Sequence, residues 1–424
     1  MSAGALRRLA QHFGTGVLDQ VLLSGANFVV GFMMIRYTSD ADYGRFVLAQ
    51  STVLLLVSAQ GAWLTGPLTM VAPGKSADAK RTMIGVIKIS QGRFLRYASG
   101  VALLISVVGY LLRSWNSVIA LTVAAAIFAS WSALHREYLR SVLLIYSRPH
   151  TVLGADLFYI AVLLAGIMLA TLARVPDAGV CAVVTLALAG WAGYWAARRA
   201  LGHDPGWKSS DPKPFWRELR PLGLWSTVGA VTYWLFAQSY NYVLATRLDL
   251  TAVTNVNAAR LVLMPVFVFT LGVNNLLLPM AANWLAEFGL QRLLRRLALL
   301  VAAIAALDFL YLVPAWFMRG WLIQDLMHKT IGGQDRLLVL WATVAVIFLL
   351  REVLQAALFA MGRVKSLARL IGVSAAISLS LTWFGISWWG AAAALIGQVA
   401  GECFNLLGLA LLLSRQVYLG RRAH

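Results

Sequence analysis

One arginine stands within a long apolar stretch of the sequence. Arg260 follows Asn257 and is succeeded by mainly apolar residues as far as Val273. A guanidinium inside a bilayer costs several kcal/mol, so intramembrane arginines usually face a watery cavity and serve a function. Guanidinium binds phosphate through paired, charge-assisted hydrogen bonds. Arg260 is therefore a candidate ligand for an anionic group; the alternative is a side chain that extends from its helix end to the membrane surface.

Helical spacing predicts polar residues on the same face as Arg260. At 3.6 residues per turn, Asn257, Arg260 and Asn274 fall on one stripe of a helix. We predict that this stripe lines a cavity and that lipid-facing residues lie behind it.

Two other stretches carry uncharged polar side chains on one helical face. Gln20 and Asn27 share a face of the first apolar run, and Gln238 and Asn241 lie one turn apart in a later run. Amides at these positions suit the hydroxyl groups of sugars. They suit hydrogen bonds between membrane helices equally well, so both interpretations stay open.

A pair of opposite charges occurs twice. Arg136-Glu137 recurs as Arg351-Glu352, 215 residues later and in similar leucine-rich surroundings. Such pairs could hold two halves of the molecule in register as an inner gate. Exposed ion pairs contribute little, so we favour a solvated helix end for both. The recurrence predicts two related halves.

The composition indicates which class of protein positions these residues. The chain has 424 residues, 60% hydrophobic and 12% charged, with a mean hydropathy of +0.74. Soluble proteins carry roughly twice that charged fraction. Apolar runs of about 20 residues, the length that spans a bilayer, recur throughout. The sequence predicts an all-α, polytopic membrane protein.

We predict twelve spans, six in each half. They are expected at 15–37, 44–66, 96–112, 116–134, 152–172, 178–197, 222–246, 254–278, 297–316, 337–360, 366–386 and 390–413. This arrangement gives an N-terminal lobe over 1–200, a cytoplasmic linker over 201–221 and a C-terminal lobe over 222–424. Six spans per copy give both lobes the same orientation in the membrane, with a binding site expected between them.

The net charge of +19 has a topological explanation. Most of the 36 Lys and Arg residues fall on loops that lie inside if the N-terminus is cytoplasmic. We therefore expect both termini in the cytoplasm and no nucleic-acid partner. Cys181 and Cys403 lie in apolar runs, so no disulfide framework is expected.

Enzymatic and metal chemistry find little support. Pro73-Gly74-Lys75-Ser76 lacks the first glycine of a phosphate-binding loop, a position taken by Thr69. The six histidines show no pair at metal-ligand spacing. The predicted outer loops offer no nucleophile or paired carboxylates. We expect no metal, no cofactor and no enzymatic activity.

Three short segments resemble those of bacterial polysaccharide and O-antigen flippases. They are Asp42-Tyr43-Gly44, Asn257-Ala258-Ala259-Arg260-Leu261 followed by Pro265, and Leu277-Leu278-Pro279. The span count is similar over nearly the whole chain. These flippases belong to the superfamily of multidrug, oligosaccharidyl-lipid and polysaccharide exporters.

The resemblance implies two six-helix lobes in a V around a central cavity. It implies that an undecaprenyl-diphosphate-linked oligosaccharide moves across the bacterial cytoplasmic membrane, toward lipopolysaccharide, capsule or exopolysaccharide. It also implies that Arg260 binds the diphosphate. Membrane lipids, a polysaccharide polymerase and a chain-length regulator are the candidate partners.

Two carboxylates could couple such transport to an ion gradient. Asp308 and Glu402 lie within predicted spans, where a carboxylate can bind a proton or sodium ion. Either could instead pair with Arg260 or Arg351, and we favour that structural role for Asp308. Two rival functions remain: a multidrug or cation antiporter of the same superfamily, and a membrane polysaccharide polymerase.

Overall fold

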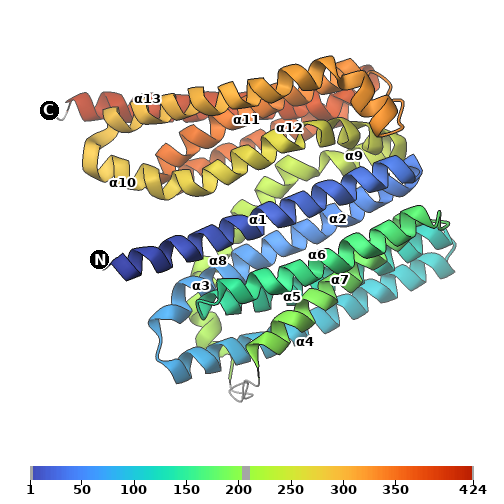
Figure 1. Ribbon diagram of the computed structural model, residues 1–424, viewed down its shortest axis with the longest axis horizontal. Coiled ribbons are helices and arrows are strands. Elements are labelled where there is room, and N and C mark those ends of the chain that lie inside the picture. Colours follow the sequence, from blue (N-terminus) through green and yellow to red (C-terminus); the bar gives the residue numbers. More distant parts are fainter. Residues whose placement is uncertain (1–2, 203–210, 423–424) are drawn as a thin grey trace. The chain divides into compact units, whose positions relative to one another are not determined.

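The computed structural model describes residues 3–202 and 211–422, apart from the side chains of 3–13 and of a few later residues, 274–276 among them. Every regular element in this part of the chain is a helix (Figure 1). In chain order the elements are α1 (Ala3–Tyr37), α2 (Asp40–Gln60), η1 (Gly61–Thr65), α3 (Gly66–Val71), η2 (Ala72–Gly74), α4 (Ala77–Leu111), α5 (Ser117–Ile145), α6 (Pro149–Leu172), α7 (Ala178–Leu201), α8 (Lys213–Gln238), α9 (Tyr240–Arg247), α10 (Leu250–Phe317), η3 (Trp321–Leu326), α11 (Gln334–Ala360), α12 (Val364–Trp389) and α13 (Ala392–Arg422).

Eleven stretches in the described residues are long and apolar enough to cross a bilayer. The predicted all-α, multi-span fold is therefore confirmed. The predicted span at 222–246 is not among the eleven, and this part of the chain is divided at Ser239 between α8 and α9. The apolar run is continuous in sequence, but no single helix follows it.

Several helices are longer than predicted. The third span was expected to begin at residue 96, but α4 begins at Ala77, and α5 continues past the predicted end of its span to Ile145. Lys88 and Arg140, expected on inner loops, lie on these two helices. Hydropathy detects only the apolar part of a helix. The charged part that continues the same helix has low hydropathy and is missed, although charged residues also form helices.

The predicted linker, 201–221, is described only in part, because residues 203–210 lie outside the described residues. From Lys213 onward the chain is helix α8. The first turns of α8 pack on earlier helices: Leu219 is fully buried there, and Lys75 forms an ion pair with Glu218 at 2.8 Å. Contacts divide the chain into a first unit, Met1–Val231, and a second unit, Thr232–His424.

In the first unit α5, α6 and α7 pack side by side, with α1 against α6. Asp42 organises the start of α2: its carboxylate accepts hydrogen bonds from the Gly179 backbone N–H (3.0 Å) and from Arg45 (2.9 Å). A Cβ on Gly190 would lie 2.3 Å from the Ser132 hydroxyl. The missing side chain therefore lets α5 and α7 approach closely, as small residues do in membrane bundles.

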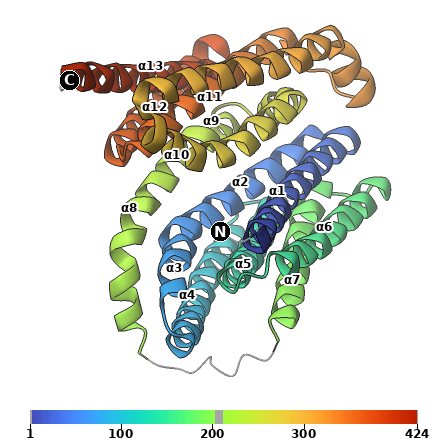
Figure 2. The same ribbon diagram turned by 60° about the vertical axis from the view of Figure 1, so that its left-hand side comes forward.

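In the second unit α11 packs against α10 and α13, and α12 packs against α13, as the yellow to red helices of Figure 2 show. The long helix α10 changes direction at Gly289, whose positive φ of 74° only glycine adopts without strain. Two of the eleven candidate spans, Leu250–Val273 and Asn283–Phe317, lie within α10.

The element bounds repeat the sequence offset between the halves. Helix α5 ends at Ile145 and α11 at Ala360, and α6 begins at Pro149 and α12 at Val364. Each of these bounds is shifted by the 215 residues that separate the two Arg-Glu pairs. The repeat seen in the residues is thus also a repeat of helices.

Candidate functional site

Three of the predicted binding residues form one chain of hydrogen bonds in the second unit. Asn257 on α10 donates to the Asn241 side-chain oxygen on α9 at 2.7 Å, and Asn241 donates to Gln238 at the end of α8 at 3.3 Å. Asn257 also donates to the Val253 carbonyl at 2.8 Å. The amides therefore connect three successive helices, as the structural interpretation of them requires, while Gln238 stays half-buried.

A break between α8 and α9 positions the hydrogen-bonded amides. Helix α8 ends at Gln238 and α9 begins at Tyr240, so the backbone near the break needs other hydrogen-bond partners. Gln398 on α13 donates to the Phe236 carbonyl. A side-chain amide from a neighbouring helix thus stabilises the interruption that turns Gln238 and Asn241 toward α10.

Arg260 lies one turn beyond Asn257 and is half-buried. Its guanidinium carbon lies 5.5 Å from the centroid of the Trp341 ring on α11. The Tyr240 hydroxyl is also within electrostatic reach of the guanidinium. No carboxylate in the described residues forms an ion pair with Arg260, although such pairs exist for the half-buried Arg136 and Arg140 and for the buried Arg351. A cation held in this way can attract an anion.

The remaining predicted binding residues are not brought to this chain of amides. The side chain of Asn274 lies outside the described residues, although its backbone belongs to α10. Gln20 and Asn27 are exposed side chains on α1 of the first unit. Their role in binding stays a prediction.

The second Arg-Glu pair is part of a buried cluster. Arg351 and Glu352 on α11 form an ion pair at 2.8 Å, and Arg351 also contacts Glu402 on α13 at 2.7 Å. Arg351 is 1% exposed and Glu352 is 5% exposed. The favoured interpretation of a solvated helix end is wrong for this pair. Arg351 lies nine residues before the end of α11, about 14 Å along the helix axis at 1.5 Å per residue.

The first Arg-Glu pair belongs to a larger network in the first unit. Arg136 and Glu137 on α5 form an ion pair at 2.7 Å, and Glu137 also faces Arg140 at 3.4 Å. Arg140 contacts Asp19 on α1 and lies 2.8 Å from Asp156 on α6. Both aspartates are buried. The network joins three helices, so this pair is not a solvated helix end either.

Sequence reasoning missed Asp19, Asp156 and the partner role of Arg140. The signal was present, because both aspartates lie inside predicted spans, 15–37 and 152–172, where a charged residue asks for a partner. Arg140 was assigned to a loop, which concealed that partner. The error in the helix boundary therefore became an error in the site.

A buried lysine was missed for the same reason. Lys88 on α4 is 6% exposed, and its ammonium nitrogen lies 5.1 Å from the Tyr138 ring and 5.0 Å from the Tyr194 ring. The ammonium makes no hydrogen bond among the described residues. Two ring faces therefore stabilise this charge in place of an acceptor.

The two predicted ion-coupling carboxylates differ in their surroundings. Glu402 is bound to Arg351, as above. Asp308 on α10 is 7% exposed, and it takes part in none of the ion pairs found among the described residues. Asp308 forms neither of the ion pairs that we expected for it. Arg260 contacts the Trp341 ring, and Arg351 pairs with Glu352 and Glu402.

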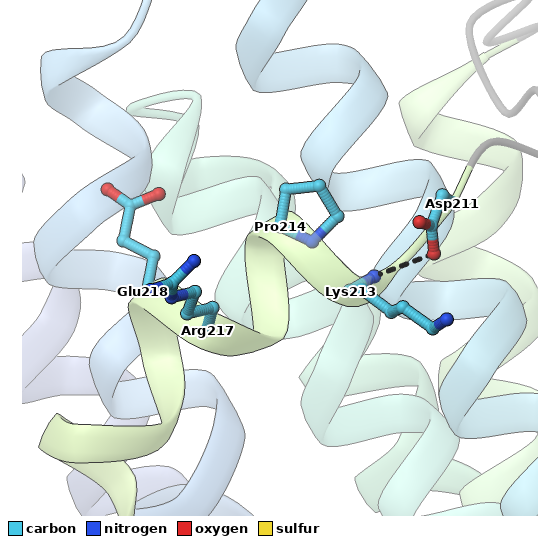
Figure 3. A pocket seen from close by; sticks show the side chains of 5 residues that line it. All are labelled: Asp211, Lys213, Pro214, Arg217 and Glu218. Atoms are coloured by element: carbon cyan, nitrogen blue, oxygen red, sulfur yellow. Dashed lines mark hydrogen bonds between the residues drawn. The ribbon is translucent and has the colours of Figure 1, made fainter.

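Two concave surfaces lie apart from these residues. Figure 3 shows a hollow at the start of α8, lined by Asp211, Lys213, Pro214, Arg217 and Glu218, all of them exposed. An apolar groove of about 500 Å³ lies between α10 and α11 and includes Val262, Phe309 and Val346. Neither surface contains a residue predicted from the sequence to bind a ligand.

The described part of the chain is all-helical, with eleven candidate membrane spans and with charged residues buried inside several of them. No family model matches the chain, and no curated protein matches it in sequence. Solved structures do share its fold, which is that of transporters of the MOP superfamily.

One match is an inward-facing multidrug resistance MATE family transporter of the MOP superfamily, with a TM-score of 0.74, 12% identity, and coverage of 95% of this chain and 96% of that one. A second is the lipid II flippase MurJ in an inward closed conformation, with a TM-score of 0.69, 12% identity, and coverage of 96% and 87%. A third is a variant of the MATE transporter VcmN from Vibrio cholerae, with a TM-score of 0.63, 12% identity and coverage of 97% of both chains. Multidrug transporters and a lipid flippase thus share this fold.

Proposed function

We propose that the chain is a flippase for an undecaprenyl-diphosphate-linked oligosaccharide, such as a polysaccharide or O-antigen repeat unit, in the bacterial inner membrane. The observation that carries this proposal is Arg260, a half-buried guanidinium in a membrane-spanning helix without a carboxylate partner in the described residues. A diphosphate supplies the negative charge that Arg260 lacks. The likeness in fold to the lipid II flippase MurJ supports a lipid-linked substrate.

The proposed cycle follows from the chemistry of the substrate. The isoprenoid tail stays in the lipid, because exposing it to water costs about 0.8 kcal/mol per methylene. Only the diphosphate and sugars need a polar path, which alternating access of the two lobes would open to each side in turn. Arg260 holds the diphosphate, and the sugars pass along the half-buried Gln238, which Asn241 and Asn257 connect to the same helix.

The test is complementation of a bacterial strain that lacks this gene. Hydrogen bonds to charged groups contribute about 1.5–3 kcal/mol, so Arg260→Ala is expected to lower the export of surface polysaccharide by about tenfold or more. Arg260→Lys should keep part of the activity, because lysine retains the charge but loses the paired geometry.

The control is Arg247→Ala, which removes another arginine that stacks on a tryptophan, Trp383, in the same unit at 4.6 Å. It should export normally. Normal export by Arg260→Ala, at a protein level equal to wild type, would show that the proposal is wrong.

A multidrug or cation antiporter is the second candidate. The observations in its favour are the MATE transporters among the structural matches and the buried Asp19 and Asp156. Asp19 and Asp156 both contact Arg140, so they do not offer a free carboxylate to a cation, whereas the buried Asp308 could bind a coupling ion in either kind of transporter. Expression in a drug-sensitive strain distinguishes the candidates: an antiporter raises the tolerated drug concentration, and Arg260→Ala leaves that concentration unchanged.

A further inference from the structure

The buried and half-buried arginines inside the helical bundles differ in which group faces their charge. Arg136 lies 2.7 Å from Glu137, and Arg351 lies within 2.8 Å of both Glu352 and Glu402. Each of these guanidinium charges is neutralised inside the protein. Arg260 instead faces the ring of Trp341, which is uncharged. A ring attracts a cation through its quadrupole and leaves the net positive charge in place.

Trp341 is held in a fixed orientation. Its indole N–H donates to the Val256 carbonyl at 2.9 Å, on the turn of α10 that leads to Arg260. Tyr240 contacts the indole edge-on at a centroid distance of 6.2 Å, and Phe267 does so at 5.8 Å. Trp341 is 4% exposed. The ring face that Arg260 meets is therefore set by contacts from α9 and α10.

Tyr240 adds a polar atom to the same place. The residue is 1% exposed, and its hydroxyl makes no hydrogen bond of ordinary geometry with the described residues. The hydroxyl is within electrostatic reach of Arg260 and of the Asn241 amide. A buried hydroxyl without a partner would cost about 1–3 kcal/mol, and the Arg260 guanidinium and the Asn241 amide are the groups near enough to satisfy this one.

We propose that Trp341 and Tyr240 are positioning residues that hold the Arg260 guanidinium without neutralising it, so that its charge is available to the diphosphate of the substrate. This inference rests on the function proposed above and deepens it. A carboxylate in place of the indole would hold the arginine as firmly, but it would compete with the anionic ligand. The aromatic contact avoids that competition because it carries no charge of its own.

The experiment is a calorimetric titration, in which inorganic diphosphate is added to the purified full-length protein in detergent and the heat of binding is measured. Cation–π contacts contribute about 0.5–2 kcal/mol, so Trp341→Leu should weaken diphosphate binding by about twofold to thirtyfold. Trp341→Phe, which keeps a ring, should lose less. Tyr240→Phe removes only the hydroxyl and should weaken binding by a few fold. Trp383→Leu, at the ring that faces Arg247, is the matched control and should bind as wild type does.

A double-mutant cycle separates positioning from a general structural role. If Trp341 acts through Arg260, then Trp341→Leu causes no further loss of affinity in an Arg260→Ala background. Equal losses in both backgrounds overturn the inference, as does unchanged affinity in Trp341→Leu or a failure of the wild type to bind diphosphate. Export in cells judges the proposed function separately: if Arg260→Ala binds no diphosphate yet exports normally, the function fails and the positioning role stands.

Discussion

The arginine of the second unit's buried cluster shows how costly an unbalanced charge is inside a bundle. Arg351 is 1% exposed and is the counter-charge of two carboxylates, on α11 and α13. Burying an ion pair gains little over apolar packing, whereas removing one partner leaves the others without compensation. The cluster therefore affects the stability of the protein mainly when one of its charges loses its opposite charge.

Arg351→Ala is expected to lower the stability of the protein by about 3–5 kcal/mol, because Glu352 and Glu402 lose their partner. The effect is measured by heating the protein in detergent and using size-exclusion chromatography to determine how much folded protein remains at each temperature. Adding Glu402→Gln to this variant should restore part of the loss, since one uncompensated charge is removed. A double variant less stable than Arg351→Ala alone would contradict this account.

Asp308 is the stronger of the two candidates for the coupling ion. It is buried on α10 and takes part in none of the ion pairs of the described residues, whereas Glu402 is held by Arg351. Intramembrane carboxylates without such a partner commonly carry protons or ions. Asp308→Asn should leave expression and melting temperature close to wild type, while export ceases to respond to the proton or sodium gradient.

The check is uptake of a fluorescent or radiolabelled lipid-linked glycan into inverted vesicles, with each gradient imposed in turn. Glu402→Gln is the comparison, and its main effect is expected on stability. An Asp308→Asn protein that still responds to both gradients would exclude Asp308 as the coupling group.

At the residue scale, the sequence pattern singled out the three amides Gln238, Asn241 and Asn257, but it did not predict the hydrogen bonds between them. Asn257 and Arg260 were placed on one helical face, and the structure has them one turn apart on α10. That Asn241 would accept from Asn257 depends on the break at Ser239. Helical periodicity locates faces within one helix, and only tertiary packing decides which faces meet.

At the scale of elements, close approach between helices depends on missing side chains. A Cβ on Gly397 of α13 would lie 2.5 Å from the Ser378 carbonyl oxygen of α12. The backbone cannot yield without moving a whole helix. Gly372 of α12 offers a contrast, because the nearest atom to its Cβ would be a methyl group of Thr232 at 3.9 Å.

The two glycines predict effects of opposite sign. Gly397→Ala should destabilise the protein by about 1–3 kcal/mol, as overpacking does in well-packed interiors. Gly372→Ala should be neutral or stabilise it by up to about 1 kcal/mol, since alanine favours helix and meets no obstacle. Melting temperatures of the two variants, measured side by side, decide the matter. A melting temperature that falls equally in both would mean that helix contact is not the cause.

Helix lengths show the limit of reading elements from hydropathy. The apolar spans were located well, but α4 and α5 continue into charged sequence that was assigned to loops. Lys88 is buried there beside aromatic rings from other helices, and the half-buried Arg140 is paired with carboxylates from other helices. A local window cannot see such partners, so it counts these residues as solvent-exposed.

At the scale of the whole molecule, the internal repeat is the feature that the sequence predicted most directly. The 215-residue offset of the Arg-Glu pairs returns in the bounds of α5 and α11 and of α6 and α12. The surroundings of the two pairs have diverged: Asp19 and Asp156 join the first, and Glu402 joins the second. A repeat fixes helix order, whereas each copy adapts its own charge partners.

The repeat and the distribution of basic residues together predict how the chain is threaded through the membrane. With an inside N-terminus, and with α8 and α9 together crossing the membrane as the twelve-span prediction requires, the loop that contains η3 lies outside and the start of α8 lies inside. Single cysteines test this threading in a protein whose native Cys181 and Cys403, both half-buried, are replaced by serine. Gln324→Cys and Asp211→Cys place a thiol at exposed positions in those two regions.

A membrane-impermeant maleimide should label Gln324→Cys in intact spheroplasts, whereas Asp211→Cys should be labelled only after the membrane is permeabilised. The reversed result would place the basic loops outside and turn the substrate path around. That outcome would also bear on Arg260, because the half of the membrane in which α10 begins depends on the same threading. A guanidinium that meets the diphosphate must be reachable from the cytoplasmic side, where the lipid-linked substrate of the proposed reaction starts. The labelling pattern therefore tests the direction of transport together with the topology.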